Sequence, residues 1–366
     1  MAASDEALSA VVQDQIAVTR LEASEMRRVR RILTDLEGEL VAKIARIDPT
    51  GPAANTHRTK RLKKLLDETR ALIAEVYTDI NKTTRETRAR LAVQQSRSLV
   101  KRTNTRIGVD ILRATLPARE AARISREVLI QGAVSRDWWN SQSVALQKRF
   151  EQEMQKGLVA NEDISQLSAR VRGTRENAFT DGIMAVTKSQ AESLVRTSLA
   201  ATANESRVAT YKENSDVVKG IQWQAVLDTR TTIICQTLDG LVWDLDFNPI
   251  GHSQSYPGPT AHWGERSTQV PVLKSFEELS GKGGNKALAR ELDRRLSEVE
   301  KRASFNGEVA GKETYESWLR KQPKSVQVEA LGPARRELWL EEGLSFTEMI
   351  TQQNRPLSIE QLEEKV

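Results

Sequence analysis

The sequence predicts a predominantly helical α+β fold, with long N-terminal helices, then a small mixed α+β domain, then a helical C-terminal region. Apolar residues recur every three or four positions through most of the first hundred residues, which is the period of an amphipathic helix. After Gly220 the period changes to two, because Ile221, Trp223 and Ala225 alternate with other residues. The charged fraction of 29% favours long solvated helices over one compact globule. We therefore expect N-terminal helical arms over 1–133, the α+β domain over 134–273, a linker and helix over 274–311, and a helical segment over 312–366.

Two long helical blocks are predicted in the N-terminal region. The first runs from Ser4 to about Ile47 and ends at a proline-containing turn, because proline removes backbone donors. The second runs from Thr59 to about Ser98, and no proline stops it before Pro117. Aromatic residues are only 5% of the chain, so these helices bury limited area per turn. We hypothesise that they need partner subunits to dock stably, because packing supplies most of the stability of a helix.

Shorter helices are predicted on both sides of the α+β domain. Before it lie a basic segment from Arg119 to Ile130, a helix after Trp138–Trp139 that ends at Gly157, and a helix capped within Asn161–Ser165. After it lie a flexible linker from Ser280 to Asn285, a helix from Ala287 to Ala303, and two or three short helices between Lys312 and Val366.

Most of the chemically specific side chains lie between Thr187 and Leu273. Thr187 and Gln190 form the pattern of a capping box, which predicts the start of a helix. The alternation after Gly220 predicts a strand that ends at Asp228, and a second helical segment is predicted to begin at Thr229.

The same region is predicted to close with an edge strand. Asp239–Gly240 is a turn signal. Gln269–Leu273 is expected at a sheet edge, because proline is tolerated there. The tryptophans at 223, 243 and 263 are expected to form the core of the unit.

Composition excludes several classes of protein. The single cysteine, Cys235, excludes an internal disulfide and leaves too few thiols for a cysteine-based structural zinc site. No apolar run approaches the roughly 20 residues that span a bilayer, and residues 1–6 do not have the pattern of a signal peptide. We therefore expect no membrane partner and a reducing compartment.

The order of motifs in the central region is distinctive. The motif residues are Arg196 and Thr197 on a helix, Trp223 on a strand, Asp228, Arg230 and Thr231 in a turn, then Cys235 and Gly240, and His262, Arg266 and Ser267 in a closing segment. This order resembles the phage head morphogenesis family, the Mu F-like minor head proteins. The closing cysteine of the family pattern is Glu265 here. A second stretch, from Tyr315 to Pro333, resembles the C-terminal part of the same proteins.

The resemblance implies a minor capsid protein of a bacteriophage virion that is associated with the portal. Its implied roles are head assembly, genome packaging and DNA ejection, and it would be structural, with no enzymatic activity and no cofactor. The implied partners are the phage portal protein, the major capsid or scaffolding protein, and packaged double-stranded DNA. The implied location is the capsid interior or the portal vertex, after assembly in the host cytoplasm.

An enzymatic alternative rests on four side chains at the ends of predicted elements. Asp228, Arg230, His262 and Arg266 supply the parts of a metal-independent phosphodiesterase, so a nuclease or nucleotide-transfer enzyme is the competing interpretation. The structural alternative is that Asp228 caps a helix from Thr229 while the two arginines pair with acids. We favour the structural alternative, because nothing in the sequence fixes a nucleophile.

Cys235, His262 and Glu265 raise the question of a metal site. Glutamate at the closing position disfavours a structural zinc site, which prefers sulfur and nitrogen ligands. A lone cysteine is more often a buried free thiol. The residue types therefore predict a buried, reduced Cys235 without a metal.

Two basic clusters on the predicted arms are candidates for contact with DNA. They are Arg27, Arg28, Arg30 and Arg31, and Lys60, Arg61, Lys63 and Lys64. Such clusters are usually solvated helix faces, but their charges can also neutralise phosphates. Because no recognition helix or zinc-finger pattern accompanies them, any binding is expected to be independent of base sequence.

Overall fold

The computed structural model describes residues 10–50, 55–107, 110–280, 301–304, 307–310 and 312–366, and it confirms the predominantly helical α+β fold. The chain forms two compact units, each assembled from segments that are far apart in sequence. Unit 1 contains the described parts of 1–18, 90–124 and 200–366. Unit 2 contains residues 19–89 and 125–199.

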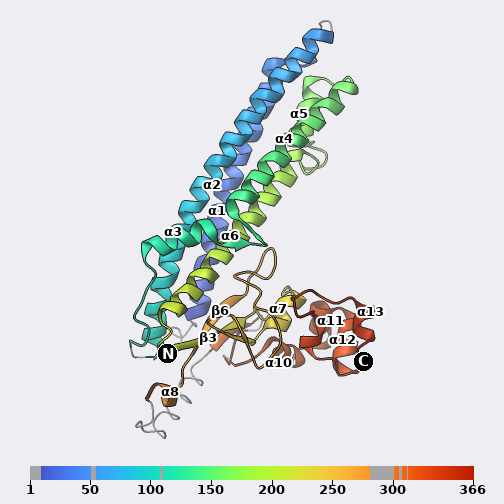
Figure 1. Ribbon diagram of the computed structural model, residues 1–366. Helices are drawn as coiled ribbons and strands as arrows, with labels where there is room; N and C mark the ends of the chain where they lie inside the picture. The colour runs from blue at the N-terminus through green and yellow to red at the C-terminus, as the bar shows by residue number, and fades with distance from the viewer. Residues whose placement is uncertain (1–9, 51–54, 108–109, 281–300, 305–306, 311) are drawn as a thin grey trace. The chain divides into compact units, whose positions relative to one another are not determined.

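Unit 2 consists mainly of long helices that run side by side (Figure 1). Its helices come from α1 (Ala10–Ile47), α2 (Asn55–Ile107), α4 (Ser135–Val159), α5 (Ile164–Arg172) and α6 (Ile183–Glu213). The residues that face the interior have helical spacing and are almost fully buried: Val29, Leu33, Leu36, Leu40 and Ile44 of α1, Leu65, Ile73 and Ile80 of α2, and Trp139, Leu146, Phe150 and Met154 of α4. These stripes are buried inside the chain itself. The hypothesis that the arms need partner subunits to dock stably stays a prediction.

Ion pairs fix the register of these helices. Lys43 of α1 contacts Glu68 of α2 at 3.0 Å, and Lys188 of α6 contacts Glu37 of α1 at 2.8 Å. Because α1 and α2 run in opposite directions, residues that precede Glu68 on α2 lie beside residues that follow Lys43 on α1 (Figure 1).

The helix starts in unit 2 differ in part from the prediction. The helix α6 begins at Ile183, and the Thr187 hydroxyl donates to the Ile183 carbonyl at 2.8 Å, so the capping box predicted at Thr187 is wrong. The predicted cap of α5 is confirmed, because the Asp163 carboxylate accepts from the Gln166 amide while the Gln166 side chain accepts from the Asp163 amide.

Gly157 was predicted to end a helix, but α4 continues to Val159. A Cβ at Gly157 would lie 2.3 Å from Leu167 Cδ2 and 2.7 Å from a Glu162 oxygen. The absence of a side chain therefore permits the close approach of α5.

The basic segment predicted as a helix to Ile130 is shorter. The helix α3 (Ala118–Glu127) is followed by β1 (Leu129–Ile130), which pairs with β2 (Ala133–Val134) in an antiparallel hairpin. Gln131 and Gly132 adopt positive φ in the turn, and the short hairpin ends the helical pattern early.

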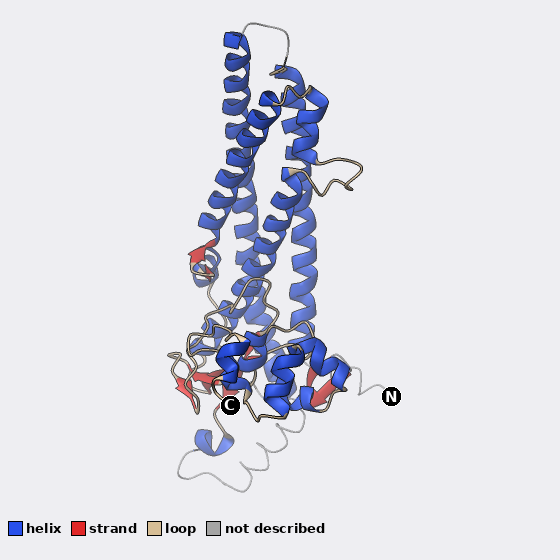
Figure 2. Cartoon of the chain, turned by 90° about the vertical axis from the view of Figure 1, so that its right-hand side faces the viewer, coloured by secondary structure: helices blue, strands red, loops and turns tan. Residues whose placement is uncertain are grey.

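Unit 1 is built on a four-stranded antiparallel sheet in the order β5-β4-β3-β6, coloured red in Figure 2. The strands are β3 (Val218–Gln224), β4 (Val242–Asp244), β5 (Pro249–Ile250) and β6 (Thr268–Leu273). Trp223 pairs with Gln269, and Ile221 pairs with both Trp243 and Pro271. The edge position predicted for β6 is confirmed. The strand β3 ends four residues before the predicted Asp228.

The core of unit 1 lies against this sheet. Trp223 and Trp243 are buried, as predicted, whereas Trp263 is 39% exposed, so its predicted core position is wrong. A Cβ at Gly220 would lie 2.5 Å from the Trp243 carbonyl oxygen, which explains why β3 has glycine at the point of closest approach to β4. The helix α7 (Ile233–Leu238) adds Cys235 and Leu238 to the same core.

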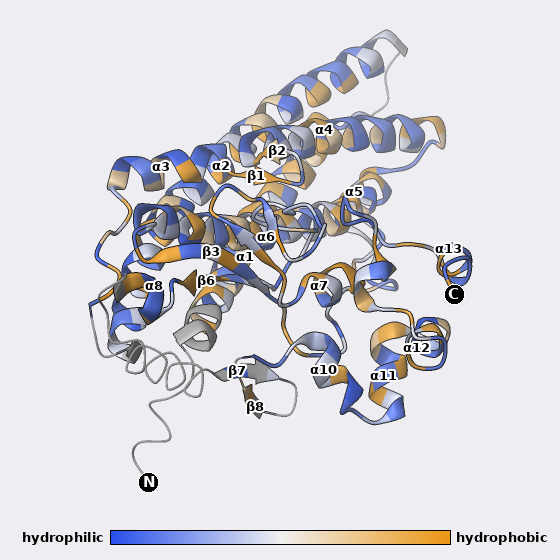
Figure 3. Cartoon of the chain, turned by 60° about the horizontal axis from the view of Figure 1, so that its bottom comes forward, coloured by the Kyte–Doolittle hydropathy of each residue, from blue (hydrophilic) through white to orange (hydrophobic). Residues whose placement is uncertain are grey.

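Short helices at the C-terminus form a second core of unit 1. They are α10 (Tyr315–Arg320), α11 (Lys324–Leu331), α12 (Pro333–Leu340), a 3-10 helix (Phe346–Met349) and α13 (Ile359–Glu363). Tyr315, Trp318, Trp339 and Phe346 pack in this core, and Figure 3 shows hydrophobic and hydrophilic residues alternating along α11 and α12. None of the described helices has the length and apolarity needed to cross a membrane.

The segment between the sheet and α10 differs from the prediction where the structure describes it. After α8 (Phe276–Ser280), the strand β7 (Lys301–Ser304) pairs with β8 (Gly307–Ala310), so the helix predicted to Ala303 is wrong at its last three residues. Residues 281–300, which carry most of the predicted linker and helix, lie outside the described residues.

Candidate functional site

The motif residues divide between the two units. Arg196 and Thr197 belong to unit 2, where Arg196 Nη2 lies 3.8 Å from Met26 Sδ and the buried Thr197 hydroxyl donates to the Ser193 carbonyl. Trp223 and the motif residues that follow it belong to unit 1. Those from Asp228 to Cys235 lie in α7 or just before it, and those from His262 to Ser267 lie in the loop before β6, whereas Trp223 is on β3 and Gly240 follows α7.

Asp228 and Arg266 form a bidentate ion pair. Arg266 Nη1 donates to Asp228 Oδ2 and Nη2 donates to Oδ1, both at 2.7 Å. Asp228 Oδ1 also accepts from the Arg230 amide and the Thr231 hydroxyl, each at 3.1 Å. Burial acts to raise the pKa of Asp228, but the hydrogen bonds and charge of Arg266 outweigh it and hold that pKa below its usual value.

Arg266 pairs with an acidic side chain, as the structural alternative predicted. The other part of that alternative, in which Asp228 caps a helix that begins at Thr229, is wrong. The helix α7 begins at Ile233, with Thr232 as its N-cap, so Asp228 closes a turn ahead of the helix. The Arg230 side chain is 81% exposed and reaches Asp228 only at 3.8 Å. This turn supplies no positioned nucleophile.

Cys235, His262 and Glu265 converge on one point. Cys235 lies on α7 and is 1% exposed, and Glu265 lies in the loop before β6 and is 2% exposed. The Cys235 Sγ atom is 3.1 Å from His262 Nε2 and 3.1 Å from Glu265 Oε1. His262 Nε2 is 3.6 Å from Glu265 Oε2. Ligand atoms of all three residues lie within 4.8 Å of one another, so the cluster could hold a metal ion.

The backbone orients each polar group of this cluster. His262 Nδ1 lies 2.8 Å from the Trp263 carbonyl oxygen, which accepts hydrogen bonds only, so Nδ1 carries the proton and Nε2 presents its lone pair. The Glu265 carboxylate accepts from the backbone amides of Ala261, Arg266 and Ser267, at 3.2, 3.1 and 2.8 Å.

The arrangement does not suit nucleophilic catalysis by the thiol. Burial, and then the charge of Glu265, raises the pKa of Cys235 well above its usual value, so the thiol stays protonated. Glu265 contacts the thiol itself and does not orient the histidine through Nδ1, as the third member of a triad does. Among the described residues, the side-chain partners of His262 are Thr232, Cys235 and Glu265, and they include neither Asp228 nor an arginine.

A buried ion pair supports this region from a position that the sequence did not single out. Arg302 of β7 donates to both carboxylate oxygens of Asp239 at 2.9 Å. The same carboxylate accepts from the amides of Ala225 and Tyr315, at 2.7 and 2.6 Å. Asp239 follows α7, so this pair ties the turn of the Gly240 motif to β7 and α10. The sequence did not single out Arg302, because it lies in a segment that was predicted to be helical and no pattern there indicates a buried arginine.

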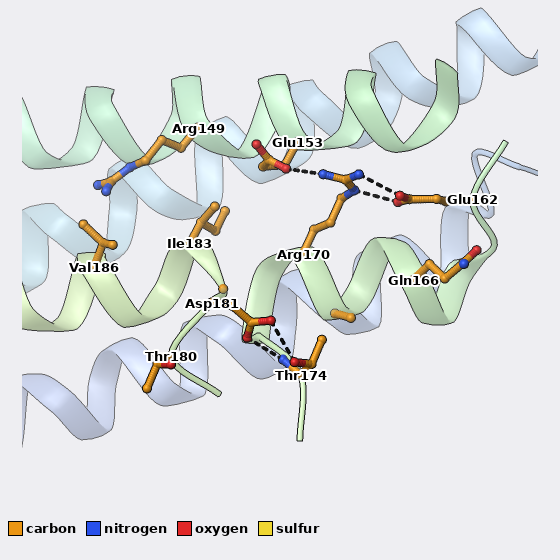
Figure 4. A pocket seen from close by; sticks show the side chains of 12 residues that line it. Arg149, Glu153, Glu162, Gln166, Arg170, Thr174, Thr180, Asp181, Ile183 and Val186 are labelled. Carbon is orange, nitrogen blue, oxygen red and sulfur yellow. Dashed lines mark hydrogen bonds and ion pairs between the residues drawn. The ribbon is translucent and has the colours of Figure 1, made fainter. Parts of the chain in front are cut away.

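An open pocket of about 490 Å³ lies in unit 2, between α4, α5 and the start of α6 (Figure 4). Arg170 lies between Glu153 and Glu162 and is hydrogen-bonded to both. Asp181 accepts from the backbone amide and the hydroxyl of Thr174, each at 2.7 Å. Arg170 is thus paired with the two glutamates and Asp181 is held by Thr174, so the pocket has the features of a structural network.

The two basic clusters are in different places on unit 2. Lys43 of α1 contacts Glu68 of α2, and the cluster at 60–64 lies 4 to 8 residues before Glu68, so it is beside the C-terminal end of α1. Arg27–Arg31 lies 12 to 16 residues before Lys43 itself, so the two clusters are more than roughly 18–24 Å apart along the helix axis at 1.5 Å per residue. Arg28 and Arg30 are paired with Glu25 and Glu192, and Lys64 lies 3.9 Å from Glu68. The exposed members are Arg27, Arg30, Arg31, Lys60, Lys63 and Lys64. The structure therefore holds two separate patches.

The order of the motif residues along the chain resembles that of the phage head morphogenesis family. Residues 145–270, about a third of the chain, match the family model described as Phage Mu protein F like protein. This match confirms the resemblance to the phage head morphogenesis family. It runs from α4 through β3 to the middle of β6 and includes Asp228, Cys235 and His262. No curated protein and no solved structure matches the chain.

Proposed function

We propose that this protein is a minor capsid protein that binds the portal of a tailed phage and acts in head assembly, genome packaging or ejection. The match of residues 145–270 to the Phage Mu protein F like family carries this proposal. A head morphogenesis protein is expected to be part of the virion, in the capsid interior or at the portal vertex. The major capsid or scaffolding protein would be a further partner.

The geometry of the motif residues supports a structural role. Asp228 and Arg266 satisfy each other, Asp239 and Arg302 form a buried pair, and Cys235 is buried. These contacts hold turns and loops together. We therefore infer that the protein is not an enzyme, because none of the described motif residues is a nucleophile positioned for the nuclease or nucleotide-transfer alternative.

Binding to the portal tests the proposal directly. The full chain would be mixed with purified portal protein, and the complex would be detected by analytical ultracentrifugation, with bovine serum albumin in place of the portal as a control. We expect a defined complex with the portal alone. A chain that sediments as a free monomer at every portal concentration would contradict the proposal.

Incubation with plasmid DNA tests the enzymatic alternative. We expect the wild-type chain to leave supercoiled plasmid intact, with and without added divalent metal ions. Cleavage by wild type that is abolished by His262→Ala would establish the nuclease in place of the structural role.

A further inference from the structure

We propose that Cys235, His262 and Glu265 bind one divalent metal ion, with zinc as the preferred metal, and that the ion fastens α7 to the loop before β6. The ligands would be Cys235 Sγ, His262 Nε2 and one Glu265 oxygen. The expectation of a metal-free thiol depends on the residue type at position 265, whereas this proposal depends on the geometry of all three side chains.

The distances fit a tetrahedral ion. Zinc bonds of about 2.0–2.3 Å place neighbouring ligand atoms roughly 3.3–3.6 Å apart. With Glu265 Oε2 as the carboxylate ligand, the observed separations are 3.1 Å from sulfur to nitrogen, 3.3 Å from sulfur to Oε2, and 3.6 Å from nitrogen to Oε2. Shifts of a few tenths of an ångström would seat the ion.

The surrounding contacts are those that metal ligands need. The Nδ1 proton of His262 is held by the Trp263 carbonyl, which leaves the Nε2 lone pair for a metal. Three backbone amides, those of Ala261, Arg266 and Ser267, fix the carboxylate of Glu265. Both arrangements are typical of the outer shell of a metal site.

Charge balance favours a dication. The Glu265 carboxylate is buried beside a thiol, and the nearby Arg266 guanidinium donates to Asp228. A zinc ion that displaces the thiol proton to solvent would face one thiolate, one carboxylate and a neutral imidazole. The two negative charges then cancel the two positive charges, so the buried site becomes neutral overall.

The donor set selects the metal. Thiolate and imidazole ligands favour zinc over magnesium and calcium, which take oxygen ligands. The three protein ligands leave a fourth position. Thr232 is exposed and its hydroxyl lies 2.8 Å from His262 Nε2, so the fourth position faces the side of the cluster that is nearest to solvent. A water molecule or a side chain from a partner protein could complete the shell.

Metal titration of the purified full chain tests the proposal. The chain would be freed of metal with a chelator, dialysed and titrated with zinc chloride in competition with a chromophoric chelator. We expect one zinc per chain. Cys235→Ser and His262→Ala should each weaken binding by more than the 10- to 100-fold typical of losing an outer-shell partner. Glu265→Cys should bind at least as tightly as wild type, because thiolate is the softer ligand.

His57→Ala is the matched control, because His57 is an exposed histidine on α2, in unit 2. Its zinc affinity should equal that of wild type. Cobalt replacement needs no variant: wild type loaded with Co²⁺ should show the charge-transfer absorption of a cobalt–thiolate bond. Wild type that binds no stoichiometric zinc, a cobalt spectrum without that absorption, or zinc binding that survives both Cys235→Ser and His262→Ala would overturn the proposal.

Discussion

Arg266 contacts Asp228 through both terminal nitrogens of its guanidinium, at 2.7 Å to each carboxylate oxygen. The two residues are 38 positions apart, so the pair fastens the turn before α7 to the loop before β6. Cys235 and Glu265 meet beside the same junction. Two features therefore stabilise this junction: the ion pair between Asp228 and Arg266, and a cluster that we propose binds zinc.

Asp228→Asn should destabilise the protein at neutral pH by about 1–3 kcal/mol, since a hydrogen bond to a charged group typically contributes about that much. The pKa of Asp228 lies below the unfolded value of about 3.9, so its contribution is complete above that pH and is lost as pH falls through the folded pKa. Urea unfolding should show a larger difference from wild type at pH 7 than at pH 3, because lowering the pH brings Asp228 towards its folded pKa.

Asp216→Asn is the matched control, because Asp216 is exposed in the same unit. It should leave stability within about 0.5 kcal/mol of wild type. An effect of Asp228→Asn that is equally large at pH 3 would show that the ion pair is not its cause.

Arg302→Ala should cost about 3–5 kcal/mol, because it leaves the Asp239 carboxylate buried without its counter-ion. Thermal unfolding of wild type and variant measures the loss. Lys219→Ala is the control, since Lys219 pairs with Glu278 at the surface and such pairs contribute about 0–1 kcal/mol. Equal losses of stability in the two variants would contradict the importance given to the Asp239 pair.

Glu22→Gln should stabilise the protein above neutral pH. Burial raises the pKa of Glu22 to about 7, against the lowering effect of Arg196, so the folded state binds a proton more tightly than the unfolded state does. Stability is therefore lost as pH rises from about 4.5 through 7. The full shift would correspond to about 3 kcal/mol, and because Glu22 is only partly buried we expect about 1–2 kcal/mol at pH 8.

Urea unfolding of Glu22→Gln at pH 8 and at pH 4 gives the comparison. The gain should be present at pH 8 and absent at pH 4. Glu39→Gln, on an exposed position of α1, should show no gain at either pH. A variant that is less stable than wild type at pH 8 would contradict the raised pKa.

DNA binding, if it occurs through the arms, should depend on the exposed arginines of α1. The double substitution of Arg27 and Arg31 by Gln should reduce the slope of log affinity against log salt by about 0.9 for each phosphate that is no longer neutralised. Arg28→Gln is the control, because Arg28 already pairs with Glu25, and it should change the slope less. Fluorescence anisotropy with two unrelated duplexes provides the measurement, and a preference of more than a few fold between them would contradict binding through phosphates alone.

Local patterns predicted much of the fold and part of the site. The alternation around Trp223 indicated the strand and its pairing with the proline-containing edge strand. The cap at Asp163 could be predicted from the few polar residues that precede its helix. Thr187 misled because a threonine inside a helix can bond back to the preceding turn. The predicted burial of Trp263 was wrong, because the burial of this side chain depends on the path of the loop that carries it.

Contacts between side chains that are far apart in sequence were beyond local patterns. Arg302 meets Asp239 across 63 residues, and Cys235 meets Glu265 across 30. Each depends on how a loop returns to α7, which no residue spacing encodes. Residue type at position 265 alone therefore argued against a metal, and only the geometry of the three side chains raised the question again.

The amount of this chain in purified virions, measured beside the portal protein by quantitative mass spectrometry, tests the central claim most directly. A portal-associated minor head protein should be present at a fixed, low number of copies per portal ring, and should stay with the particle through density-gradient purification. A chain that is abundant in infected cells but missing from particles that contain the portal would contradict the proposed function.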